Sequence, residues 1–103
     1  MAPKLTSRLQ YRNLHRVLTE LFYRHDPIGL AAMGAPEDEY EAEVSTVIPR
    51  LKDANGPDDV RRIVYQEFLR WFGTEETAGP ESGYNDLAKD IWNKLAEVTS
   101  AQD

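Results

Sequence analysis

The stretch HDPIGLAAMGAPEDEYEAE (residues 25–43) decides where one helical pattern ends and the next begins. Pro27 disfavours α geometry in the residue before it, so the first helix is predicted to end by Asp26. The tetrapeptide DPIG (residues 26–29) then matches a type I turn, in which aspartate bonds the backbone two residues on and glycine suits the fourth position. In the alternative interpretation, Asp26 caps a short helical turn that starts at Pro27.

The connector also carries apolar residues, which are expected to pack on the core: Ile28, Leu30 and Met33. A loop that exposed all three would leave an apolar patch in water. An architectural role for this loop is the preferred interpretation, and a binding surface formed by the loop is the alternative.

Four segments repeat apolar residues every three or four positions, which is the spacing of amphipathic helices. Ser7, with Gln10 three residues later, forms the pattern of a capping box at the start of the first segment. Gly56 and Pro57 mark a helix stop followed by a helix start. The predicted helices are residues 8–25, 36–53, 57–72 and 83–98.

Two prolines shape the second predicted helix. Pro36 suits the first helical position, where its missing N–H has no helical partner to lose. Pro49 lies in the interior, where proline removes a backbone bond and clashes with the preceding turn, at roughly 3 kcal/mol. Because Pro49 lies opposite the apolar stripe, we expect a kink there that bends the helix around the core.

The third predicted helix is apolar on nearly all sides. Tyr65 and Leu69 lie opposite its main stripe, so this helix is either central or covered by a partner, which is compatible with a homodimer. The stripe itself consists of Val60, Ile63, Val64, Phe68, Trp71 and Phe72.

No segment alternates apolar and polar residues with the β-branched enrichment of a strand. The sequence therefore predicts an all-α fold in a compact four-helix arrangement. The segment TEETAGPESG (residues 74–83) is expected to be a polar loop. We expect one domain over residues 1–103, frayed at 1–6 and 99–103.

The composition narrows the class of protein. The chain has 103 residues, no cysteine and a formal net charge of −6. Without cysteine there is no disulfide framework or Cys-based zinc site. No apolar run approaches the ~20 residues needed to cross a bilayer, and the start lacks the apolar core of a secretory signal, so a cytoplasmic location is expected. The acidic balance disfavours nonspecific nucleic-acid binding and suits a basic protein partner.

Acidic residues crowd the start of the second predicted helix: Glu37, Asp38, Glu39, Glu41 and Glu43. As a solvated helix start, they would interact favourably with the helix dipole. As a docking surface, they would bind a basic partner. A metal site is not predicted, because a calcium loop needs ligands spaced along a loop with an internal glycine.

Glu67 is predicted to project on the buried side of the third helix, between Ile63 and Trp71. A carboxylate there must be paired, hydrogen-bonded or protonated. An ion pair or a Tyr or Trp donor is the preferred interpretation, since a functional acid would have no partner nucleophile. His15 and His25 lack the spacing of metal-ligand motifs and are expected to be structural.

Arg8, Arg12 and Arg16 form a basic strip on the first predicted helix. The strip is expected to face water or the acidic second helix. In the alternative it contacts phosphates, which would make the chain a nucleic-acid accessory protein, but no nucleic-acid-binding motif accompanies it. No nucleophile elbow or glycine-rich phosphate loop is present in the sequence, so no catalytic residue or cofactor is predicted.

The pairing of DPIGL (residues 26–30) with PEDEY (residues 36–40) resembles a family of small bacterial helical proteins of unknown function called YugE-like. The segments FLRWFG (68–73) and LAKDIW (87–92) extend the resemblance. The resemblance implies a helical fold and no particular reaction. Its motif positions are Asp26, Pro27, Ile28, Gly29, Asp38, Glu39 and Tyr40.

The leading hypothesis is a small non-enzymatic interaction protein, immunity- or antitoxin-like. Its acidic second helix and the preceding loop would bind a basic protein, such as a secreted nuclease, by electrostatic complementarity. The hypothesis is drawn from the size and acidity of the chain and from its lack of catalytic motifs.

Overall fold

The computed structural model describes residues 7–100, and over these residues the chain is all α, as predicted. Five α-helices and two 3₁₀ helices are present, and no strand occurs in this part of the chain. The elements are α1 (Arg8–His25), α2 (Glu41–Val47), η1 (Ile48–Asp53), α3 (Pro57–Phe72), α4 (Glu75–Ala78), η2 (Glu81–Tyr84) and α5 (Asn85–Ser100).

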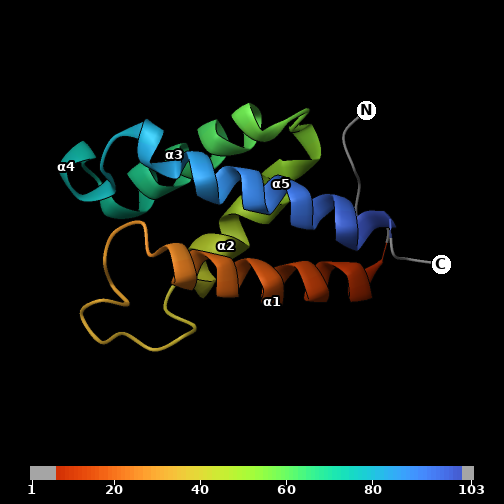
Figure 1. The fold of residues 1–103 in the computed structure, drawn as a ribbon, viewed down its shortest axis with the longest axis horizontal. Coiled ribbons are helices and arrows are strands. Elements are labelled where there is room, and N and C mark those ends of the chain that lie inside the picture. Colours follow the sequence, from red (N-terminus) through yellow and green to blue (C-terminus); the bar gives the residue numbers. More distant parts are fainter. Residues whose placement is uncertain (1–6, 101–103) are drawn as a thin grey trace.

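The long helices α1 and α5 lie side by side and run in opposite directions (Figure 1). α5 also packs against α3, and α2 contacts both α1 and α3. The apolar stripes of these four helices meet in one core. At its centre the rings of Phe22, Tyr40 and Phe68 are in mutual contact, with centroids 5.7 to 6.3 Å apart.

Helices α1 and α3 have the predicted bounds. The hydroxyl of Ser7 accepts a hydrogen bond from the Gln10 N–H at 3.1 Å and caps the start of α1. The cap residues that follow α1 and α3 are Asp26 (φ +51°) and Gly73 (φ +81°), both in the left-handed region that commonly terminates helices. Apolar spacing and capping residues were therefore sufficient to place these two helices.

The prediction that a helix begins at residue 36 is wrong. Residues 36–40 form turns, in which the Glu39 N–H donates to the Pro36 carbonyl and the Glu41 N–H donates to the Asp38 carbonyl, both at 3.0 Å. The backbone here closes the connector before α2 begins at Glu41. The disturbance predicted at Pro49 takes the form of a change from α to 3₁₀ geometry at Ile48.

The predicted polar loop at 74–83 contains a short helix. Thr74 accepts a hydrogen bond from the Thr77 N–H at 3.3 Å and caps α4, while Ala78 is buried. A helix of four residues is too short to show a repeating apolar pattern, so spacing did not reveal it.

The C-terminal helix is displaced from its predicted bounds. α5 begins at Asn85 instead of residue 83, because η2 precedes it. It continues to Ser100, past the predicted end at residue 98 and into the segment 99–103 that is expected to fray; the Thr99 hydroxyl donates to the Leu95 carbonyl at 2.8 Å. The other predicted frayed residues, 1–6 and 101–103, lie outside the described part of the chain.

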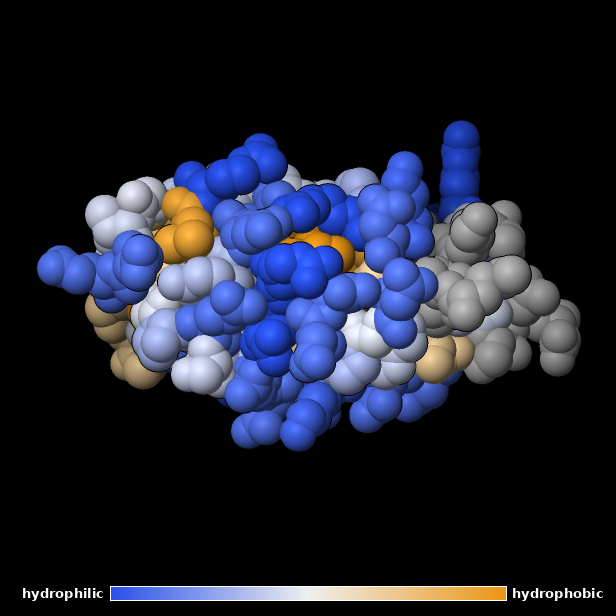
Figure 2. All heavy atoms as spheres, turned by 90° about the horizontal axis from the view of Figure 1, so that it is seen from above, coloured by the Kyte–Doolittle hydropathy of each residue, from blue (hydrophilic) through white to orange (hydrophobic). Residues whose placement is uncertain are grey.

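Helix α3 takes the central position, with contacts to α2, α4, η2 and α5. Trp71 departs from the prediction: it is 46% exposed, and its Nε1–H donates to the Thr46 hydroxyl at 3.0 Å. The face shown in Figure 2 is mainly hydrophilic, with small apolar areas. Within residues 7–100, none of the helices combines the length and apolar character required to span a membrane.

Candidate functional site

The carboxylate of Asp26 organises the connector between α1 and α2. Its Oδ1 accepts a hydrogen bond from the Ala31 N–H at 2.8 Å, and its Oδ2 accepts one from the Ala32 N–H at 3.0 Å. The predicted bond to the backbone two residues on is therefore replaced by bonds five and six residues on. The physical reason is that Asp26 adopts left-handed backbone geometry as the cap of α1, and its side chain reaches across the loop.

The predicted turn is present, since the Gly29 N–H donates to the Asp26 carbonyl at 3.1 Å. A second turn follows at residues 30–34. The alternative interpretation, in which Asp26 caps a helical turn that starts at Pro27, is therefore wrong, and the carboxylate of Asp26 instead accepts from N–H groups of this second turn.

Tyr40 completes the arrangement from the other end of the connector. Its hydroxyl donates to Asp26 Oδ1 at 2.7 Å and accepts from the N–H groups of Ile28 and Leu30, at 3.4 Å each. Its ring is fully buried, against one ring of α1 and one of α3. A single side chain therefore belongs to both the core and the connector.

Both members of this pair have displaced pKa values. Desolvation acts to raise the pKa of Asp26, but the hydrogen bonds from Tyr40 and from the loop N–H groups outweigh it and lower the pKa from its ordinary value. Burial, and after it the hydrogen bond to Asp26, raises the pKa of the Tyr40 hydroxyl. Asp26 is therefore the ionised acceptor and Tyr40 the neutral donor at neutral pH.

A second anchor holds the far side of the loop. The Tyr23 hydroxyl donates to the Ala35 carbonyl at 3.1 Å, a bond that helical spacing did not indicate because its acceptor is loop backbone. Ile28 and Leu30 are partly buried against the core, as predicted. The prediction for Met33 is wrong: it lies between the anchored residues Ala32 and Ala35, and its side chain is 74% exposed.

The acidic residues divide into an exposed and a buried set. Glu37, Asp38, Glu39 and Glu41 are exposed. We call these four residues, together with Met33, the connector surface.

Glu43 does not join the exposed acids. It is only 6% exposed, and its Oε1 has no hydrogen-bond partner. Because α2 places Glu43 four residues before the buried Val47, both lie on the same side of the helix. Burial first, and the neighbouring charge of Glu39 in addition, raises the pKa of Glu43. An exposed docking role for Glu43 is therefore excluded by its burial.

Glu67 is 1% exposed, as its position on the apolar side of α3 indicated. Its Oε2 accepts from Arg50 at 3.0 Å and from Arg70 at 3.2 Å, whereas its Oε1 has no hydrogen-bond partner. The ion pair with Arg50 links η1 to α3. The contacts of Glu67 are structural, and no nucleophile is among them.

The two histidines join helices. His25 Nε2 lies 2.8 Å from Asp90 Oδ2 and connects the end of α1 to α5. His15 Nε2 lies 3.1 Å from Ser45 Oγ and connects α1 to α2. Both contacts agree with the structural role that was expected, although the sequence did not indicate either partner.

The basic strip of Arg8, Arg12 and Arg16 is exposed, and Arg16 lies 4.0 Å from Glu20 on the same helix. The strip therefore faces water, one of the two outcomes expected for it.

The connector surface can supply negative charge and an apolar contact. In the described part of the chain, no three His, Asp or Glu side chains are grouped so that they could hold a metal ion. The resemblance to the YugE-like family remains a prediction based on its motif. No family model, curated protein or solved structure matches this chain.

Proposed function

We propose that this protein is a non-enzymatic, cytoplasmic interaction protein that binds a basic protein partner through the connector surface. One observation carries the proposal. Three exposed carboxylates and an exposed methionine lie on a loop whose base is held by the hydrogen bond between Asp26 and Tyr40, and a fourth exposed carboxylate, Glu41, begins α2 directly after it.

The charge of the connector surface favours a partner rich in lysine and arginine. No lysine or arginine occurs between residues 26 and 49, so nothing on this segment neutralises its carboxylates. Complementary charge accelerates association and selects partners, and its effect weakens as salt screens it. The binding is therefore expected to be faster at low ionic strength.

Met33 supplies the apolar part of the surface. Its side chain is unbranched and polarisable, so it adapts to an irregular apolar partner surface. Interfaces commonly place apolar contacts at the centre and polar groups at the rim. Met33 with the neighbouring carboxylates has the composition that such an interface requires.

The hydrogen bonds at the base of the connector lower the entropic cost of binding. A loop that is ordered before binding loses less conformational freedom when a partner arrives. Asp26 fixes the N–H groups of Ala31 and Ala32, which directly precede Met33. The backbone beside the apolar contact is therefore ordered in the free protein.

The most specific form of the proposal is an immunity- or antitoxin-like role, in which the connector surface blocks a basic enzyme such as a nuclease. Small size and excess negative charge support this form, because an acidic surface competes directly for the cationic site that such an enzyme offers to nucleic acid. The partner is thus expected to lose nucleic-acid binding when this protein occupies it.

Affinity capture from lysate of the source cell tests the proposal. The probe is the full chain, compared with a variant that carries Glu37→Gln, Asp38→Asn, Glu39→Gln and Glu41→Gln. The matched control neutralises four exposed acids elsewhere: Asp53→Asn, Glu75→Gln, Glu76→Gln and Asp86→Asn. We expect the wild type and the control to retain the same basic protein, and the connector variant to lose it.

The captured protein is then purified and titrated at two salt concentrations. Binding that weakens with salt, and that falls when Met33→Ser is introduced, supports the connector surface. Equal retention by all three chains, or a partner that is not basic, would contradict the proposal.

A further inference from the structure

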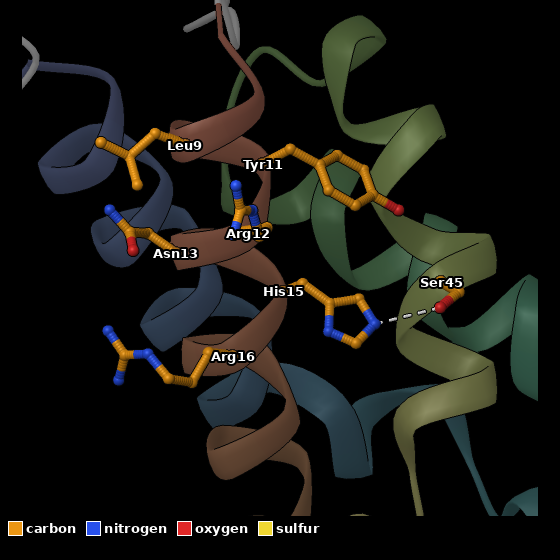
Figure 3. A pocket seen from close by; sticks show the side chains of 7 residues that line it. All are labelled: Leu9, Tyr11, Arg12, Asn13, His15, Arg16 and Ser45. Carbon is orange, nitrogen blue, oxygen red and sulfur yellow. Dashed lines mark hydrogen bonds between the residues drawn. The ribbon is translucent and has the colours of Figure 1, made fainter.

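The outward side of α1 carries an open hollow of about 620 Å³ that the proposed protein partner does not use. Figure 3 shows Tyr11 and His15 on the side of α1 that faces α2, and Arg16 on the other side, with Arg12 between them. The hollow lies within the range of about 300–1,000 Å³ that is typical of small-molecule sites. Its lining includes two arginines and no acidic residue.

An aromatic surface borders this hollow. The rings of Tyr11 and His15 are stacked, with centroids 6.2 Å apart and an interplanar angle of 27°, and Tyr11 is 38% exposed. Ser45 Oγ donates to the Glu41 carbonyl at 3.0 Å, so it accepts the hydrogen bond from His15 Nε2. His15 is therefore fixed between α1 and α2, and the Tyr11 ring beside it offers a flat face to a planar ligand.

The cations in the lining are available to an anion. Among the salt bridges formed within residues 7–100, none includes Arg12, and that of Arg16 with Glu20 is long, at 4.0 Å, and solvent-exposed. Such exposed pairs are weak. Arginine donors match the oxygens of a phosphate and form charge-assisted hydrogen bonds with it.

We propose that this hollow binds a nucleotide, with the base stacked on Tyr11 and the phosphate held by Arg12 and Arg16. Stacking on an exposed aromatic ring combined with cations for the phosphate is the chemistry by which proteins hold single-stranded nucleotides. The net charge of −6 opposes a long polyanion, whereas a ligand of nucleotide size carries few charges. The nucleotide is either free or part of a short single strand.

Titration of the full ¹⁵N-labelled chain with AMP, adenosine and inorganic phosphate tests this site by NMR. We expect saturable shifts at the amides of residues 9–16 and 45 with AMP, and binding at least about tenfold weaker with adenosine or phosphate alone. An oligoadenylate of four nucleotides is titrated in the same way. If it binds more tightly than AMP, the site is assigned to a single strand; if it binds equally or more weakly, the site is assigned to the free nucleotide.

Variants separate the two contacts. Arg12→Gln with Arg16→Gln is expected to weaken AMP binding about tenfold or more, while Arg24→Gln, which removes one exposed arginine of α1 outside the hollow, is the control for a general effect of charge. Tyr11→Ala should bind AMP no more tightly than phosphate, and Tyr11→Phe should retain the AMP affinity. Absence of saturable shifts, equal affinity for phosphate and AMP, or an equal loss in Arg24→Gln would overturn the proposal.

Discussion

The hydroxyl of Tyr40 donates a 2.7 Å hydrogen bond to the carboxylate of Asp26, which caps the end of α1. This contact joins the end of one helix to the residue that precedes the next. Since Tyr40 is also a core residue, burial of its ring and closure of the connector depend on the same side chain.

Removal of the Tyr40 hydroxyl should destabilise the fold without emptying the core. Tyr40→Phe keeps the ring but leaves Asp26 without one donor, and the N–H groups of Ile28 and Leu30 without their acceptor. We expect a loss of about 1–3 kcal/mol in the free energy of unfolding, measured by urea denaturation. The control is Tyr11→Phe on the exposed face of α1, which should change stability little. Equal stabilities for Tyr40→Phe and wild type would show that the connector is not held by this bond.

Neutralisation of Asp26 should have an effect that depends on pH. Asp26→Asn preserves the size of the side chain and tolerates left-handed backbone geometry, so it mainly removes the charge. Because folding lowers the pKa of Asp26, the stabilisation by its carboxylate is present above the ordinary pKa of 3.8 and is lost as pH falls through the lower, folded value. We expect Asp26→Asn to be less stable than wild type at pH 7, with the difference shrinking in acid. Thermal melting from pH 7 to pH 2 measures this, and a difference that does not vary with pH would contradict it.

The contribution of Glu43 to stability should depend on pH in the opposite way. Burial raises its pKa above the ordinary 4.5, so its unfavourable contribution is absent below that pH and develops as pH rises through the folded value. Glu43→Gln removes the charge, and we expect it to melt at a higher temperature than wild type at pH 7 and at a similar temperature near pH 3. Glu41→Gln on the exposed side of α2 is the control and should have little effect at either pH.

The buried carboxylate of Glu67 should be coupled to Arg50. Arg50→Met removes the shorter of the two ion pairs of Glu67 and leaves its buried charge less well satisfied. We therefore expect the free energy of unfolding to fall by about 1–3 kcal/mol. In a Glu67→Leu background, Arg50→Met should lower the free energy of unfolding much less, because no buried carboxylate remains at position 67. A double-mutant cycle by urea denaturation gives the coupling energy. Additive effects of the two substitutions would refute the coupling.

The positions of the main helices were predictable because their information is local. Leu14, Leu18 and Leu21 have the three- and four-residue spacing of one side of a helix, and all three are buried. Capping by Ser7 and termination at Gly73 depend on a few neighbouring residues, which sequence displays directly. The start of α2 was misplaced because Pro36 fits both a helix start and a turn, and only closure of the connector distinguishes them.

The candidate site was predictable only in part. Its residue types were visible in the sequence, and the exposure of Glu37, Asp38, Glu39 and Glu41 agrees with a surface role. Glu43 was misassigned because it was grouped with its acidic neighbours by residue type, although its spacing of four residues before Val47 places it on the buried side of α2. Met33 was misplaced for a different reason: an apolar residue in a loop can face either way, and the anchors at Tyr23 and Tyr40 leave it outside.

The sequence by itself determined the helical class, the buried sides of the long helices and the net negative charge. Each of these depends on residue type and on spacing along a segment. Tertiary structure alone decided which polar atoms meet: Asp26 with Ala31 and Ala32, and Tyr40 with Asp26. The physical reason is that apolar periodicity repeats within a helix, whereas hydrogen bonds in a connector form only after both of its ends are packed on the core.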